Sequence, residues 1–176
     1  MSNKQEKIII LGHSGSGKDY LRKGLQKLGL RYSPKFTTRP KRDSEVNGLD
    51  YDFIDFDLYI DFAKNNNIKT SETFVINGIN WYYGITNENW TNNQIFIMTT
   101  KELSQLTREE RQKCFVVYLK MDKDVIKQRL LERKDYNDSI ERRMIADDKD
   151  FEGFVDYDLC LTDSEFEIET VFDLMN

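Results

Sequence analysis

The chain has 176 residues, 39% hydrophobic and 32% charged, which suits a single globular domain and excludes a disordered polymer. Its 31 acidic and 26 basic residues leave a net charge of −5, so we expect neither a nucleic-acid polymer nor a membrane as a partner. Two cysteines cannot form a disulfide framework, and the one histidine excludes a zinc site of the Cys/His type. No apolar run approaches the length of a signal peptide or membrane span, so we expect a cytoplasmic protein.

The chain opens with a strand and a helix joined by a glycine-rich turn. Residues 7–11 form a short continuous apolar run, which is typical of a strand buried on both faces of a parallel sheet. Leucines at helical spacing follow, and Gly29 is a candidate for the end of that helix. The turn between them, residues 12–18, reads Gly-His-Ser-Gly-Ser-Gly-Lys. The order of a buried strand, a glycine-rich turn and a helix is a strong local signal that these residues form one strand–turn–helix unit.

The middle third of the chain has the pattern of an antiparallel excursion from the main sheet. Asp57 is a candidate N-cap for a short helix that carries Leu58 and Phe62. Two runs of β-forming residues, 72–76 and 79–83, flank the dipeptide Asn-Gly. An Asn-Gly pair between such runs is the strongest short-range signal for a β-hairpin, so we expect a hairpin here.

The last part of the chain returns to buried strands that alternate with helices. The apolar runs that predict strands are 94–98, 115–119 and 157–161. The helical patterns are roughly 101–106, 122–132, 139–151 and 165–175. Strands alternating with helices predict an α/β fold, in which a parallel sheet lies between two layers of helices.

The glycine-rich turn matches the Walker A pattern of phosphate-binding loops, except that Asp19 stands where Ser or Thr is usual. Its glycines let successive backbone N–H groups curl around phosphate oxygens, at the positive end of the following helix. Lys18 would place a point charge between the β- and γ-phosphates. We therefore expect ATP to bind along Gly12, His13, Ser14, Gly15, Ser16, Gly17, Lys18 and Asp19.

Asp19 has two interpretations. The usual hydroxyl at this place ligates Mg²⁺, and the strand end Met98-Thr99-Thr100 lacks the acidic residue that commonly assists it. The Asp19 carboxylate is a hard oxygen ligand that suits Mg²⁺, directly or through water. Alternatively, Asp19 only complements the positive end of the helix dipole. Both interpretations stay open at this point.

Several motifs, in order and spacing, resemble the guanylate kinase family across nearly the whole chain. Residues 12–18 look like the family's phosphate-binding loop, and residues 37–42 with 45–51 resemble its nucleoside-monophosphate motif. Tyr82-Tyr83-Gly84 resembles its tyrosine-glycine signature, and residues 128–133 with 140–143 resemble the two ends of its lid. Some deoxynucleoside monophosphate kinases of bacteriophages also carry Asp after the loop lysine.

The resemblance implies a P-loop NTPase fold in a single domain. Its three-layer core with a parallel sheet would comprise residues 1–32, 89–132 and 144–176. A small antiparallel subdomain that binds the nucleoside monophosphate would comprise residues 33–88, and residues 133–143 would form the lid. The resemblance leaves open whether the protein is a monomer or a homodimer.

The resemblance also implies Mg²⁺-assisted transfer of the γ-phosphoryl group of ATP to a nucleoside monophosphate, by default GMP or dGMP. The implied catalytic residues are Lys18, Arg39, Arg133 and Arg143, with Arg129 as a possible helper. The implied residues for the monophosphate are Arg39, Arg42, Tyr51, Glu72 and Tyr83, and the implied metal ligand is Asp19. The acceptor phosphate is itself the nucleophile, so catalysis needs no general base and depends on positioning and charge.

The residues for base recognition depart from the family's pattern. Glu72 lies two residues farther from Tyr83 than usual, which places Phe74 at the expected count, although a longer hairpin would restore Glu72 to its role. Lys35, Ile85 and Thr100 stand where the family has small polar or acidic base contacts. A kinase for a non-guanine or modified deoxynucleotide is therefore an alternative. Two others are an inactive module that binds proteins and a kinase for a non-nucleotide phosphate.

Overall fold

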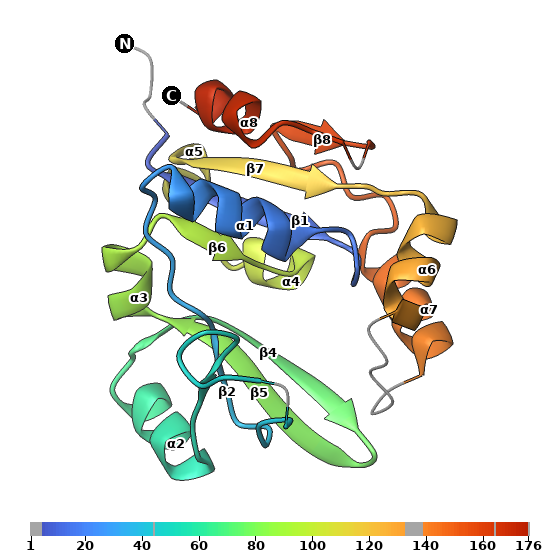
Figure 1. Ribbon diagram of the computed structural model, residues 1–176. Coiled ribbons are helices and arrows are strands. Elements are labelled where there is room, and N and C mark those ends of the chain that lie inside the picture. Colours follow the sequence, from blue (N-terminus) through green and yellow to red (C-terminus); the bar gives the residue numbers. More distant parts are fainter. Residues whose placement is uncertain (1–4, 44, 133–138, 164, 176) are drawn as a thin grey trace.

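The computed structural model describes residues 5–43, 45–132, 139–163 and 165–175 of the chain. Two sheets make up its framework, one in each half of the molecule (Figure 1). The core sheet lies in the upper half of the view, and the smaller sheet lies below it with one helix on its outer side. Helices α6 (Lys123–Glu132) and α7 (Ile140–Asp150) lie at the right of the view. Among the described residues, no helix combines the length and apolar content needed to cross a membrane.

The core sheet has the strand order β6-β1-β7-β8, and every neighbouring pair in it is parallel. Its strands are β6 (Ile95–Ile97), β1 (Lys7–Gly12), β7 (Cys114–Leu119) and β8 (Leu159–Leu161). The two central strands are buried almost throughout, as their continuous apolar sequences predict. The last strand is shorter than the predicted 157–161, because only its final three residues pair with β7.

Alternate residues of β1 feed two separate hydrophobic clusters, one on each face of the core sheet. Ile8 and Ile10 pack with side chains from α1 (Lys18–Lys27) and α8 (Ile168–Met175). Ile9 and Leu11 pack on the other face, with side chains from α3 (Asn87–Asn92) and α4 (Thr100–Leu103). Successive side chains of a strand point to opposite faces, so one strand supplies both clusters. The predicted α/β core with a parallel sheet between helix layers is confirmed.

The smaller sheet has the order β3-β2-β5-β4. Its strands are β3 (Asp52–Phe53), β2 (Phe36–Thr37), β5 (Ile79–Thr86) and β4 (Ile68–Ile76). The predicted hairpin joins β4 to β5, and both turn residues, Asn77 and Gly78, have positive φ angles of 53° and 76°. Such a pair gives the type I′ turn that favours Asn-Gly. The sheet is mixed rather than wholly antiparallel, because β2 pairs with β3 in parallel.

Helix boundaries differ from the predictions where side chains cap the helices. Asp55, and not Asp57, caps α2 (Phe56–Lys64), since its carboxylate accepts a hydrogen bond from the Leu58 backbone N–H at 2.8 Å. The helix predicted over 101–106 is the shorter α4, which ends at Leu103, and an unpredicted short helix, α5 (Arg108–Gln112), follows it. Each of them begins at a capping box, led by Thr99 and Thr107 respectively. Helix α8 starts at Ile168, three residues after the predicted start.

Candidate active site

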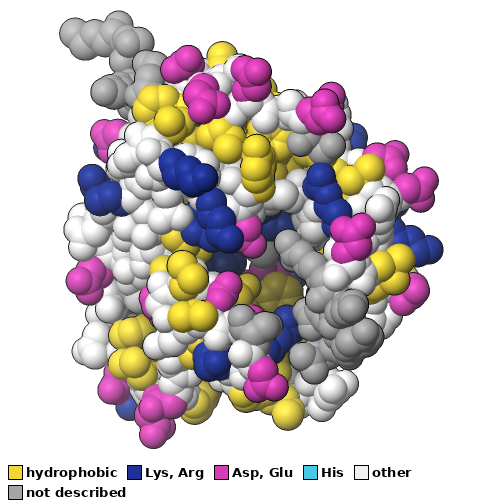
Figure 2. All heavy atoms as spheres, in the orientation of Figure 1, with side chains coloured by type: hydrophobic (Ala, Val, Ile, Leu, Met, Phe, Trp, Pro, Cys, Tyr) yellow, Lys and Arg dark blue, Asp and Glu magenta, His cyan; other side chains and the backbone are white. Residues whose placement is uncertain are grey.

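A cavity of about 490 Å³ lies between the carboxyl end of the core sheet and the smaller sheet. Figure 2 shows it as a hollow in the middle of the face, with lysine and arginine side chains around it. Ligands of open α/β sheets bind at the carboxyl ends of the strands, and this volume suits a small-molecule site. The predicted site residues that line it are Gly12, Ser14, Gly15, Gly17, Lys18, Asp19, Arg39, Arg42, Tyr51, Tyr83 and Arg143. The structure thus brings the predicted donor loop and the predicted acceptor residues to one cavity.

The donor loop connects β1 to α1, and its glycines are required by the backbone. Gly12 has a φ angle of +152°, and a Cβ atom there would lie 2.6 Å from the carbonyl oxygen of Leu119. Gly17, the N-cap of α1, has a φ angle of +101°, a conformation that L-residues with a side chain rarely adopt. The loop therefore holds the curled backbone that the motif predicts at the N-terminal end of α1.

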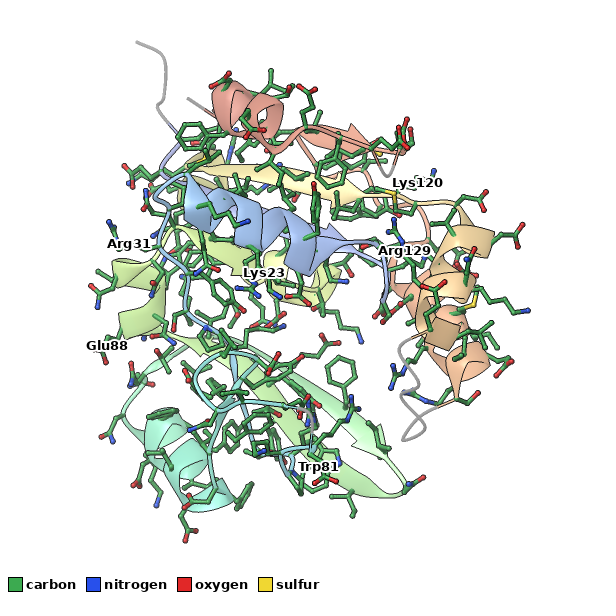
Figure 3. All side chains as sticks on the ribbon, viewed as in Figure 1. Lys23, Arg31, Trp81, Glu88, Lys120 and Arg129 are labelled. Atoms are coloured by element: carbon green, nitrogen blue, oxygen red, sulfur yellow. The ribbon has the colours of Figure 1, made fainter. Side chains whose placement is uncertain are left out.

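Two basic side chains lie on the carbonyl side of this loop. The Lys18 Nζ atom donates hydrogen bonds to the carbonyl oxygens of Gly12 at 2.7 Å and His13 at 2.8 Å. Arg129 reaches from α6 toward the loop (Figure 3), where its Nη1 atom donates to the Gly15 carbonyl oxygen at 3.3 Å. Arg129 thus contacts the loop, and its role in assisting the reaction stays a prediction.

Acidic residues of α7 lie against the same loop. One carboxylate oxygen of Asp147 accepts a hydrogen bond from the backbone N–H of Ser14 at 2.6 Å. Asp148 contacts the His13 Nε2 atom at 3.2 Å and the Lys123 Nζ atom at 2.5 Å. The hydrogen bond from Lys123 is the main cause that lowers the pKa of Asp148. The Asp147 carboxylate therefore already accepts a hydrogen bond from one of the backbone N–H groups that such loops use to bind anions.

Sequence reasoning missed Asp147, although a signal was present. Arg143, Asp147 and Phe151 are spaced four residues apart, which places them on one face of a helix. All three line the cavity, and the Phe151 ring stacks on the His13 ring with centroids 5.0 Å apart. Once Arg143 is predicted to face the substrates, this spacing points to the other two.

Arg39 is held in place by Glu45. Its Nη1 atom donates to a Glu45 carboxylate oxygen at 2.7 Å, and its Nη2 atom contacts the other oxygen, so the pair is bidentate. The guanidinium also lies over the Tyr51 ring, 5.1 Å from the centroid. Burial acts to lower the pKa of Arg39, but the hydrogen bonds to Glu45 and the electrostatic effects of Tyr83, Glu45 and Tyr51 together outweigh it and raise the pKa. Glu45 also accepts from the backbone N–H of Arg42 at 2.9 Å, so it organises both arginines.

Tyr51 and Tyr83 lie together at the cavity wall, with ring centroids 5.7 Å apart in an edge-on arrangement. Burial is the main cause that raises the pKa of Tyr51, so its phenol stays protonated and able to donate a hydrogen bond. Phe74 packs edge-on against Tyr83 at 5.2 Å and also lines the cavity. These rings form an aromatic wall beside the arginines.

Glu72 lies behind that wall and outside the lining of the cavity. It pairs with Tyr83 in the register of the hairpin. One carboxylate oxygen accepts from the Thr99 hydroxyl at 2.7 Å, the other accepts from the Lys101 Nζ atom at 3.0 Å, and the side chain is 4% exposed. A direct contact from Glu72 to a base stays a prediction.

Asp19 lines the cavity beside Lys18, and its side chain is 60% exposed. One carboxylate oxygen accepts from the Arg22 Nε atom at 3.3 Å, and Arg22 lies over the Tyr32 ring. Within the described part of the chain, no cluster of three acidic, histidine or cysteine side chains could hold a metal. Because Mg²⁺ is usually held by one or two carboxylates together with substrate phosphates and water, Asp19 fits a nucleotide-borne ion.

The predicted lid is described only in part. Arg143 lies on α7 and lines the cavity. The predicted catalytic Arg133 and the lid residues up to 138 lie outside the described residues. His13 and Ser16 belong to the donor loop but do not line the cavity, and the Ser16 hydroxyl is buried without a hydrogen-bond partner among the described residues.

Comparison with known proteins decides the family. The guanylate kinase family model matches residues 4–175, which is nearly the whole chain. This protein belongs to the guanylate kinase family. Guanylate kinase of Helicobacter pylori strain J99 is 27% identical over 176 residues, covering 95% of this chain and 84% of that protein.

Other members of the guanylate kinase family match over shorter stretches or in structure. Guanylate kinase of Mesoplasma florum is 39% identical over 80 residues, which is 44% of this chain and 27% of that protein's own length. The crystal structure of guanylate kinase from Anaplasma phagocytophilum aligns with a TM-score of 0.65 at 17% identity. That alignment covers 98% of this chain and 83% of the other, and it shows a shared fold.

Proposed function

We propose that this protein is a cytoplasmic phosphotransferase that moves the γ-phosphoryl group of ATP to a nucleoside monophosphate, with GMP or dGMP as the default acceptor. The observation that supports it is a single cavity lined by both the glycine-rich loop and the cluster of Arg39, Arg42, Tyr51 and Tyr83. One half of this lining suits a triphosphate, and the other suits a monophosphate. We assign residues 33–88 to acceptor binding and residues 133–143 to the lid.

The donor loop would bind the phosphates of ATP through its backbone N–H groups, with the N-terminal end of α1 adding favourable charge. Lys18, which now bonds to two loop carbonyls, would turn its ammonium group toward the β- and γ-phosphates. Arg129, already on the loop, and Arg143, on the cavity wall, would stabilise the charge that develops on the transferring group. Mg²⁺, when bound, neutralises phosphate charge, and Asp19 is the residue that would hold it.

The acceptor phosphate would bind between Arg39 and Arg42. Glu45 fixes the Arg39 guanidinium through a bidentate pair and bonds to the backbone of Arg42, so both arginines are positioned before substrate arrives. The phenols of Tyr51 and Tyr83 would donate hydrogen bonds without adding charge. Two phosphates held this way would meet in line, and this positioning together with charge stabilisation would supply the rate of phosphoryl transfer.

A coupled assay of ADP release with a panel of nucleoside and deoxynucleoside monophosphates tests this proposal. Turnover of at least one acceptor is expected, and no turnover with any of them would refute the enzymatic function. Calorimetry with Mg·ATP would then distinguish an inactive protein-binding module, which has no need of the nucleotide. Competition between a nucleotide acceptor and a sugar phosphate would identify a kinase for a non-nucleotide phosphate.

A further inference from the structure

A pair of buried charges crosses from the smaller sheet to the core at the cavity wall. The Lys35 Nζ atom donates to a carboxylate oxygen of Glu102 at 2.7 Å, and the backbone N–H of Thr99 donates to the same oxygen at 2.9 Å. Glu102 is fully buried, whereas Lys35 reaches the cavity with a side chain that is 15% exposed. Because they share one oxygen, the Lys35 ammonium and Thr99 lie close together on this wall.

The cavity wall around Lys35 places hydrogen-bond donors and acceptors next to each other. An ammonium carries three N–H donors, and among the described residues Glu102 is the one hydrogen-bond partner of the Lys35 ammonium, so donors remain for a ligand. The hydroxyls of Thr99 and Thr100 donate to Glu72 and to the Asp150 carbonyl respectively. The Thr99 oxygen also accepts from the Glu102 backbone N–H at 3.1 Å, which leaves it one lone pair for a ligand. A hydroxyl that has used its only hydrogen can offer only its oxygen. The wall therefore presents a cationic donor beside hydroxyl acceptors.

Neither buried carboxylate can serve as the acceptor. Both oxygens of Glu72 are bonded, to Thr99 and to Lys101. The second Glu102 oxygen has no hydrogen-bond partner among the described residues, but it is fully buried and Glu102 does not line the cavity. Phe74 adds a flat apolar ring to the same cavity, which suits the face of a nucleobase. If Arg39 and Arg42 hold the phosphate, the base can lie along Phe74 and present its edge to Lys35.

We propose that Lys35, with Thr99 and Thr100, selects acceptors whose base carries a carbonyl oxygen next to a ring N–H. Guanine, hypoxanthine, thymine and uracil share this edge: the carbonyl accepts from the ammonium and the N–H donates to a hydroxyl. Adenine and cytosine carry an amino group next to an unprotonated ring nitrogen. Their edge therefore has a donor where the first group has an acceptor, and an acceptor where the first group has a donor. A polar site built for one pattern rejects the reverse, since its buried groups would be left unpaired. This inference rests on the proposed function and makes its acceptor class specific.

The test compares kcat/KM for GMP, IMP, dTMP and UMP with that for AMP and CMP. We expect each of the first four to exceed both amino-base acceptors by about 100-fold or more. An AMP or CMP value equal to that of GMP would overturn the inference. Activity with GMP but not with IMP would also overturn it, because the 2-amino group of guanine, and not the carbonyl and ring N–H, would then determine which acceptor is used. Turnover of none would refute the proposed function, and the ratio of the Kd values for GMP and AMP, measured by calorimetry, would still decide the inference.

A variant pair tests Lys35 itself. Lys35→Met combined with Glu102→Gln removes the ammonium without leaving a buried carboxylate unpaired. We expect the preference for GMP over AMP to fall by about tenfold or more, with the KM for ATP unchanged. Lys69→Met with Glu110→Gln is the matched control, because Lys69 is similarly buried, pairs with Glu110 between the same two halves and does not line the cavity. An unchanged preference in the Lys35 pair would refute its role.

Discussion

Removal of the Asp147 side chain should strengthen the binding of ATP. The Asp147 carboxylate accepts a hydrogen bond from the Ser14 backbone N–H at 2.6 Å, inside the loop that we propose for the phosphates. A phosphate that uses this N–H must first displace the carboxylate. A triphosphate elsewhere in the loop would still be repelled by its charge. Asp147→Ala removes both obstacles and introduces the residue with the best helix propensity.

The size of the effect follows from the contact that is lost. A hydrogen bond to a charged group contributes about 1.5–3 kcal/mol net, and the short distance here is typical of the charge-assisted kind. Each 1.4 kcal/mol corresponds to a factor of ten in affinity. Asp147 is half-buried, so we take the lower end and expect Asp147→Ala to lower the Kd for Mg·ATP by about tenfold.

Isothermal titration calorimetry of Mg·ATP without acceptor measures this effect directly. Asp148→Ala is the matched control, since it removes the same charge from the next residue of α7. Its bonds go to the side chains of His13 and Lys123 and to no backbone N–H of the loop. We expect a much smaller change in Kd for this control. A Kd for Asp147→Ala equal to or higher than that of the unmodified protein would refute the reasoning.

Three further outcomes are expected from residues of the same cavity. Lys18→Ala should lower kcat by about 10²–10³-fold with an unchanged circular dichroism spectrum; activity above a few per cent would remove Lys18 from phosphate binding. Arg39→Ala and Arg42→Ala should raise the acceptor KM and lower kcat with little effect on ATP affinity, as titrations of each substrate would show. A defect mainly in ATP binding would place that arginine on the donor side. If Asp19 holds the metal, Asp19→Ser should raise the Mg²⁺ concentration needed for half-maximal kcat at saturating ATP. If it only complements the dipole of α1, the Mg²⁺ curves should coincide and stability should fall by about 0.3–1 kcal/mol.

Local chain chemistry accounts for the features that could be predicted in advance. The loop at Gly12 and Gly17 needs backbone angles that glycine adopts readily, so the loop can be predicted from its sequence motif without knowledge of any tertiary contact. The hairpin follows from Asn77-Gly78 for the same reason. The apolar run of β1 predicts a strand buried on both faces, because side chains alternate between the faces.

Local sequence patterns predicted helix boundaries less well where two neighbouring residues could each cap the helix. Both Asp55 and Asp57 are acceptable N-caps by type, and only the path of the chain into α2 decides that Asp55 meets the Leu58 N–H. The run from 101 to 106 has helical spacing, yet Thr99 and Thr107 each start a helix of their own. Such boundaries depend on hydrogen bonds that compete within a few residues of each other.

The amino-acid sequence by itself determined the phosphate loop and the alternation of strands and helices, and it pointed to Arg39, Arg42, Arg143, Tyr51 and Tyr83, which line the cavity. Only the tertiary structure decided that Lys35 pairs with Glu102, that Glu72 bonds to Thr99 and Lys101, and that Asp147 reaches the loop at Ser14. The partners in these contacts are between 27 and 133 residues apart in the chain. Periodicity and turn chemistry act over a few residues, whereas these contacts depend on how the smaller sheet and α7 pack against the core.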